Sequence, residues 1–186
     1  MRERSKDLRV RRTIASIRKA FFELVLEENF NDISITDLTE RAGINRKTFY
    51  LHYSGLDDLV NEIEEEIVES ILEQIGTFAE NLDLPGCIRN FYDYLENCSE
   101  IQKKLLCDDH YSFFYDDVTD NVLKSAQFSR FFEMTEYPEI VRSYSIAITY
   151  IYRNWIKANR NIPFDVLVAQ ACRIIEHGYA GVIKKK

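Results

Sequence analysis

Scarcity of glycine and proline is the feature that most narrows the folds open to this chain. Its 186 residues include only six glycines and three prolines. Sheet proteins use these residues at many turns, whereas long helices need them mainly at their ends. Hydrophobic residues make up 46% of the chain, which is enough apolar material for a core. We therefore predict an all-α protein of about nine helices.

Apolar residues recur at helical spacing through most of the chain. The pattern predicts one helix over residues 10–28 and another long one over 57–75, which Gly76 would end. The segment Leu84-Pro85-Gly86 marks another helix start. Shorter helices follow over 101–107 and 111–126, residues 128–137 form an irregular stretch or a broken helix, and two strong helices cover 138–159 and 164–183.

Charge is distributed unevenly along the chain. The net charge is −7, but residues 1–20 hold eight basic and two acidic residues, so this segment carries +6 and the remainder −13. A basic arm on an acidic body can face a polyanion with one end only. A solvated, disordered tail would have the same composition.

Several classes of protein fit the sequence poorly. There is no apolar run of about 18 residues and no secretory signal, so we expect a cytoplasmic protein without a membrane partner. The four cysteines lack metal-ligand spacing and are expected to be buried small hydrophobes. No nucleophile elbow, phosphate-binding glycine loop or zinc pattern is present. We expect no catalytic residue, no metal and no cofactor.

Residues 34–53 combine two short helices with a glycine turn. Ser34 or Thr36 can cap the first helix, Gly43 stops it, and Asn45 can cap the second. In a helix-turn-helix the second helix enters the major groove of DNA and the first braces it. The second helix presents side chains that can donate hydrogen bonds to phosphates or base edges: Asn45, Arg46, Lys47, Thr48, Tyr50 and His52. Phe49 and Tyr53 would hold it down. The alternative is a short amphipathic helix whose polar face is solvated and binds nothing. The basic arm just upstream favours the DNA-binding interpretation.

The same residues resemble the DNA-binding signature of the tetracycline-repressor (TetR) family. The resemblance covers about the first sixty residues. It lies in the Ala42-Gly43 turn, the Thr48-Phe49-Tyr50 centre and the His52-Tyr53 end, all in register, and in the lead-in residues Ile14, Ile17, Ala20, Phe21, Leu24 and Phe30. The remaining two-thirds resembles the family only in architecture. More weakly, it resembles a subgroup related to activators of dihydroxyacetone-kinase operons.

The resemblance implies roles for individual residues. Arg46 and Lys47 stand where base-edge or mixed contacts are made. Phosphate or nearby base contacts are implied for Thr36, Asn45, Thr48, Tyr50 and His52. The basic arm, with Arg9, Arg11 and Arg12, would follow the DNA backbone or enter the minor groove. The chain departs from the family at three positions: Asn29 replaces a glycine, Thr39 an aliphatic residue and Leu56 a lysine.

The family architecture also implies a division into two domains. Residues 1–54 would bind DNA, and residues 55–186 would bind an effector and form a homodimer. The candidates for an effector pocket are Phe91, Tyr92, Phe113, Phe114, Phe131, Tyr144 and Trp155, although aromatic residues also fill ordinary cores. The candidates for the dimer interface are Ile148, Ile151, Tyr152, Val168, Cys172, Ile175 and Tyr179, although the last two helices could instead be central in one monomer.

These observations predict a transcriptional regulator, expected to be a repressor, that binds double-stranded operator DNA as a homodimer. A small-molecule or protein effector would modulate the binding by changing the separation of the two reading helices. The alternative is an adaptor or activator that uses the same fold, is controlled by a protein partner and has no small-molecule ligand.

Overall fold

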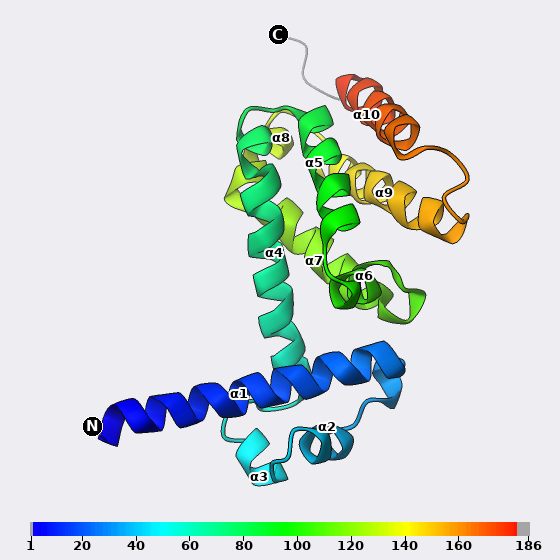
Figure 1. Cartoon of the computed structure of the whole chain (residues 1–186). Coiled ribbons are helices and arrows are strands. Elements are labelled where there is room, and N and C mark those ends of the chain that lie inside the picture. Colours follow the sequence, from blue (N-terminus) through cyan, green and yellow to red (C-terminus); the bar gives the residue numbers. More distant parts are fainter. Residues whose placement is uncertain (1, 182–186) are drawn as a thin grey trace. The chain divides into compact units, whose positions relative to one another are not determined.

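The computed structural model describes residues 2–181, with side chains from residue 8 onward. Within this range the chain forms ten α-helices and three short 3₁₀ helices, and no strand (Figure 1). The all-α prediction is confirmed, with one helix more than the nine expected. The predicted end of the last helix, at residue 183, lies outside the described residues.

Two compact units make up the chain, and the segments of each are not continuous in sequence. Unit 1 contains Met1–Glu64 and Glu100–Ser112, and unit 2 contains Glu65–Ser99 and Phe113–Lys186. The predicted boundary at residues 54/55 therefore differs from the structural one in two respects. The first turns of the helix that begins at Leu56 belong to unit 1, and so does a segment that the chain supplies some forty residues later.

Unit 1 is built on α1 (Arg2–Glu27). The 3₁₀ helix η1 (Phe30–Asp32), α2 (Ile35–Arg41) and α3 (Arg46–Phe49) follow it, then the first part of α4 (Leu56–Glu80). Figure 1 shows α2 and α3 on the same side of α1. The core consists of Ile17, Phe21, Leu24, Val25, Leu38, Phe49 and Leu59, each 1% exposed or less. Helix α1 begins eight residues before the predicted start because its basic first turns contain no glycine or proline to stop it.

The late segment of unit 1 closes the end of α1. It consists of α6 (Glu100–Cys107), which packs against α1, and η2 (Asp109–Tyr111). The buried Tyr111 hydroxyl donates to the carbonyl oxygens of Val25, at 3.4 Å, and Glu28, at 2.9 Å. The Tyr111 ring meets Phe30 edge-on, with centroids 6.3 Å apart. The last carbonyls of a helix lack partners within it, so this hydroxyl satisfies groups that burial would otherwise leave unpaired.

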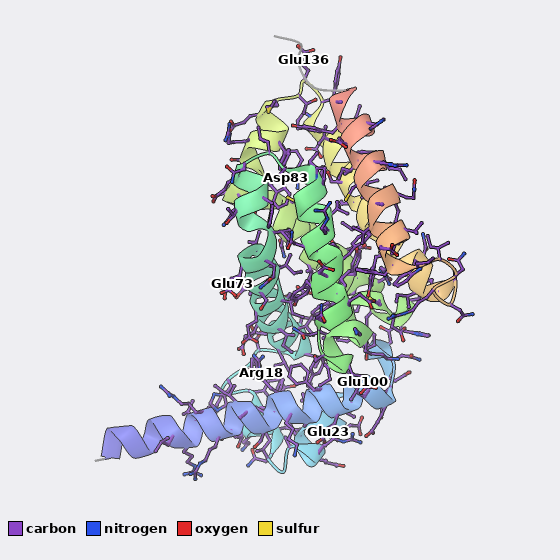
Figure 2. The ribbon with its side chains drawn as sticks, turned by 45° about the horizontal axis from the view of Figure 1, so that its top comes forward. Arg18, Glu23, Glu73, Asp83, Glu100 and Glu136 are labelled. Atoms are coloured by element: carbon purple, nitrogen blue, oxygen red, sulfur yellow. The ribbon has the colours of Figure 1, made fainter. Side chains whose placement is uncertain are left out.

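Unit 2 contains the rest of α4 and six further elements. They are α5 (Leu84–Asn97), α7 (Ser112–Lys124, whose first residue is assigned to unit 1), η3 (Ala126–Phe128), α8 (Ser129–Glu133), α9 (Pro138–Lys157) and α10 (Phe164–Ala180). Helix α10 packs against α5 and α9. Asp83 begins α5 by accepting a 2.8 Å hydrogen bond from the Gly86 amide (Figure 2).

One sequence expectation in unit 2 is wrong. Gly76 does not end α4, which continues to Glu80. A glycine inside a helix costs about 1 kcal/mol relative to alanine. Ala79, in the additional turn, is fully buried. Burial of this apolar side chain offsets part of the cost of the glycine.

Polar side chains run through the interior of unit 2. The Tyr92 hydroxyl donates to the Ile148 carbonyl at 2.8 Å, and the Tyr152 hydroxyl donates to Glu96 Oε1 at 2.5 Å. The fully buried Arg153 guanidinium lies 4.6 Å from the ring centroid of Tyr115 and 5.1 Å from that of Tyr150. Aromatic faces attract cations, and the attraction strengthens away from water. Two tyrosine rings therefore help to accommodate a buried charge.

Candidate nucleic-acid interface

Local hydrogen bonds set the ends of α2 and α3. Ser34 Oγ accepts from the Asp37 amide at 3.1 Å, and Asn45 Oδ1 accepts from the Thr48 amide at 2.9 Å. Both are N-caps of the expected kind. Gly43 lies between the helices with a φ of +66°, a backbone conformation that glycine adopts without strain. The helix–turn–helix arrangement expected from the sequence is thus present.

Buried aromatic rings hold α3 in place. Phe49 is fully buried and Tyr53 is 4% exposed, with ring centroids 5.6 Å apart. The Tyr53 hydroxyl donates to Glu62 Oε1 at 3.3 Å, and Arg18 Nη1 on α1 donates to the same oxygen at 2.6 Å (Figure 2). Burial, then the charge of Glu62 and the hydrogen bond to it, raise the pKa of Tyr53 to about 12. Tyr53 is therefore a neutral donor that links the end of the α3 segment (α3 with its flanking residues, 45–53) to α4.

The outer surface of the α3 segment carries most of the predicted DNA-binding residues. Asn45, Arg46, Lys47 and Tyr50 are exposed there, whereas Thr48 and His52 are half-buried. The Thr48 hydroxyl donates to Asn45 Oδ1 at 3.1 Å, so it already has a partner within the cap. The other predicted residues are also exposed but come from different helices: Thr36 on α2, and Arg9, Arg11 and Arg12 on α1.

Two further arginines of unit 1 form ion pairs between helices. Arg18 pairs with Glu62 at 2.6 Å, and Arg41 pairs with Glu27 at 2.7 Å. The hydrogen bond from Arg41 to Glu27 is the largest cause of its raised pKa. These arginines join helices of unit 1 to one another, whereas Arg46 and Lys47 extend from α3 into solvent.

Leu51 belongs to the same surface, although the sequence reasoning did not select it. It follows the predicted contact residue Tyr50 and is 80% exposed, more than any other large hydrophobic residue whose exposure the structure describes. The signal was available in the sequence, because Leu51 stands four positions after Lys47 and so on the same helical face.

Unit 2 contains an apolar cavity of about 50 Å³. Of the seven aromatic residues predicted for a pocket, Phe91 lines it and the other six do not. Phe114 and Phe131 are buried, and Phe113 is half-buried. Tyr92 hydrogen-bonds to α9, the Tyr144 hydroxyl to the Ile174 carbonyl and Trp155 Nε1 to the Ile162 carbonyl. The walls are mostly aliphatic and come from α4, α5, α7, η3, α9 and α10: Ile71, Ile75, Leu84, Ile88, Val118, Val122, Leu123, Phe128 and Ile175 with Cys87, Thr119, Ser145 and Thr149.

Most residues predicted for the dimer interface are buried within one chain. Ile148, Tyr152, Val168, Cys172 and Ile175 are each 7% exposed or less, and Ile151 and Tyr179 are half-buried. The apolar stripes of α9 and α10 therefore cover the chain's own core. The exposed large hydrophobic residues of these helices are Ile140, Val166 and Ile174.

Comparison with curated proteins finds regulators that match part of this chain. Over 75 residues it is 31% identical to the HTH-type transcriptional regulator YxbF of Bacillus subtilis, covering 40% of this chain and 20% of that protein. Over 97 residues it is 25% identical to an HTH-type transcriptional regulator of Haemophilus influenzae, covering 50% and 47% of the two chains. The chain thus spans about a fifth and about half the length of these relatives. No family model matches the chain.

Solved structures match the chain over nearly its whole length. A TetR transcriptional regulator from Streptococcus agalactiae aligns with a TM-score of 0.70 and 19% identity, over 93% of this chain and 98% of that one. NalD, the secondary repressor of the MexAB-OprM multidrug efflux pump in Pseudomonas aeruginosa, aligns with a TM-score of 0.57 and 16% identity, over 95% and 100%. The dihydroxyacetone-kinase subgroup stays a prediction, because the TM-score to the operon activator DhaS is 0.47. Within residues 2–181 no helix is long and apolar enough to cross a membrane. The chain has the fold of the TetR family of transcriptional regulators.

Proposed function

We propose that this chain is a sequence-specific DNA-binding regulator of transcription, and that it represses its target genes. The observation that carries the proposal is the outer surface of the α3 segment. Phe49 and Tyr53 fix this segment by burial, while Arg46, Lys47 and Tyr50 stay exposed. A reading helix needs this combination, because donors must reach base edges and phosphates from a rigid support.

The exposed arginines of α1 support the same function. Arg9, Arg11 and Arg12 give a positive surface to a protein that is otherwise acidic. Lys and Arg contacts to phosphates supply most of the sequence-independent affinity for DNA. We assign these arginines to the DNA backbone and the α3 surface to sequence recognition, with Lys47 of that surface contacting a phosphate. The regulator is expected to act in the cytoplasm and to have no catalytic activity.

We further propose a homodimer that joins through the outer face of α9 and α10. Ile140 and Ile174 are 59% and 46% exposed, and the Tyr144 hydroxyl, one turn after Ile140 on α9, donates to the Ile174 carbonyl of α10. Two-fold symmetry would place two reading helices on a palindromic operator about 34–36 Å apart. The expected stoichiometry is two chains per operator site.

An effector site in unit 2 is supported by its apolar cavity. At about 50 Å³ the cavity is much smaller than the ~300–1,000 Å³ of usual ligand pockets. A cavity of about 150 Å³ holds benzene, so an effector of that size or larger has to widen this one. An adaptor controlled by a protein partner is the alternative function.

The proposal is tested by titrating the full-length protein against duplex DNA from the region upstream of its own gene. We expect tight, selective binding that weakens steeply with salt. Lys47→Ala is expected to weaken binding and to lower the salt slope by about one unit, because one phosphate would no longer be neutralised. Lys157→Ala, at an exposed position on α9, is the matched control and should leave the slope unchanged. Fluorescence anisotropy over a range of salt concentrations measures both quantities.

The outcomes separate the two functions. If the wild-type protein binds every duplex weakly and without preference, the regulator proposal fails and the adaptor alternative is favoured. If binding is selective but Lys47→Ala behaves like Lys157→Ala, the regulator proposal stands and the assignment of Lys47 is wrong.

A further inference from the structure

Leu51 is the most exposed of the large hydrophobic residues described in the structure, with 80% of its surface accessible. An exposed leucine on a flexible tail would need no explanation. Leu51, however, lies in the hydrogen-bonded turn that continues α3. Its amide donates to the Thr48 carbonyl at 3.3 Å, and the next two amides donate to the Phe49 carbonyl at 2.9 and 3.0 Å. The leucine is therefore held in a fixed position outside the core.

The neighbours of Leu51 show what kind of surface surrounds it. Lys47 precedes Leu51 by four positions, about one helical turn, and Tyr50, which is 49% exposed, immediately precedes it in the chain. Arg46 is exposed at the start of the same helix. Leu51 is thus an apolar spot on a surface of cations and hydrogen-bond donors. A partner that fits it has to be anionic and carry small apolar groups.

Duplex DNA meets both requirements. Its phosphates match the cations, and the largest apolar group on the floor of the major groove is the C5 methyl of thymine. We propose that Leu51 contacts the C5 methyl group of a thymine in the operator and so selects a T·A pair at that position. This inference rests on the proposed DNA-binding function. It adds a residue that recognises its base through apolar contact rather than hydrogen bonding.

The test removes each member of the contact in turn. Binding sites are first selected from random duplexes with the full-length protein. Each thymine of the selected site is then replaced by deoxyuridine, which lacks only the methyl group. We expect one replacement in each half-site to weaken wild-type binding about fourfold, the equivalent of about 0.8 kcal/mol for one buried carbon. Leu51→Ala should bind the thymine and deoxyuridine versions of that site equally well.

Leu26→Ala is the matched control, because Leu26 is also an exposed leucine of unit 1, at 43%, but belongs to α1 and not to α3 or the turn that follows it. It should keep the wild-type response to deoxyuridine. Thermal unfolding checks the fold of each variant, and no change is expected at so exposed a position as 51.

The comparison distinguishes the possible failures. If wild type and Leu51→Ala respond alike at every thymine, Leu51 does not contact a methyl group and the inference is wrong, although the protein still reads DNA. If random selection yields no preferred site, the proposed function fails and this inference fails with it. Unchanged operator affinity of Leu51→Ala would also overturn the inference.

Discussion

The helix-turn-helix segment (residues 34–53) and unit 2 are stabilised by polar contacts over very different distances along the chain. In the segment, Ser34 caps through the Asp37 amide and Asn45 through the Thr48 amide, each three residues away. In unit 2, Tyr92 reaches Ile148, Tyr152 reaches Glu96, and Tyr179 reaches Phe131, at separations of 48 to 56 residues.

This difference explains what each region demands of its sequence. A cap needs a suitable residue at a fixed number of positions from the amide that it accepts from, so neighbouring residues alone determine the helix ends of the segment. A tyrosine that bonds to a distant carbonyl needs the whole packing arrangement to be in place first. Unit 2 can therefore vary in sequence wherever its packing can be remade, whereas the ends of α2 and α3 tolerate few residue types.

The largest expected effect tests whether the segment depends on burial as well as on caps. Phe49→Ala removes a fully buried ring that contacts Tyr50 and Tyr53. We expect the free energy of unfolding to fall by about 3–5 kcal/mol, because a cavity replaces the ring. Urea unfolding of the full-length protein measures the decrease. A decrease below about 1 kcal/mol would mean that the local caps alone hold α3.

An intermediate effect is expected where α9 and α10 pack closely in unit 2. A Cβ atom at Gly178 would overlap the Tyr144 ring and hydroxyl, so Gly178→Ala should destabilise the protein by about 1–3 kcal/mol. Gly181→Ala is the control, because the nearest atom to its Cβ is a carbonyl oxygen at 3.4 Å. If the overlap is the cause, Gly178→Ala should cost little further stability once Tyr144→Ala is present, as a double-mutant cycle in urea would show.

The smallest expected effect concerns a local cap. Asn45→Ala removes the acceptor for the Thr48 amide and should cost about 1 kcal/mol. Asn45→Asp keeps an acceptor oxygen and should restore most of that stability. Thermal unfolding of the two variants separates capping from any role of Asn45 in DNA contact. Equal melting temperatures for Ala and Asp would show that the cap contributes nothing measurable.

Much of unit 1 could be predicted from the sequence because its signals are local. The cap at Asn45 and the turn at Gly43 are predicted from the sequence and confirmed, and of the two candidates for the cap of α2, Ser34 and Thr36, the structure uses Ser34. Gly76 shows the limit of this approach. A glycine favours a helix end, but here the burial of Ala79 one turn later favours continuation.

The predictions for unit 2 are less specific, because an apolar stripe on a helix indicates that the stripe is buried but not which part of the protein covers it. The sequence predicts that Ile148, Val168 and Ile175 contact a second copy, yet their own chain buries them. Likewise, the aromatic type of Trp155 or Phe131 does not distinguish a cavity wall from a filled core. The cavity forms where side chains from six elements come together. The spacing of residues along the sequence does not predict how these side chains pack.

The return of residues 100–112 to unit 1 has a consequence for engineering and for evolution. A fragment ending at residue 64 would lack α6 and Tyr111, and would leave the Val25 and Glu28 carbonyls without the hydroxyl that they accept from. Unit 1 therefore cannot be transferred as one continuous fragment. A chimera that exchanges unit 1 between relatives has to carry both of its segments, and recombination at a single crossover would separate parts that fold together.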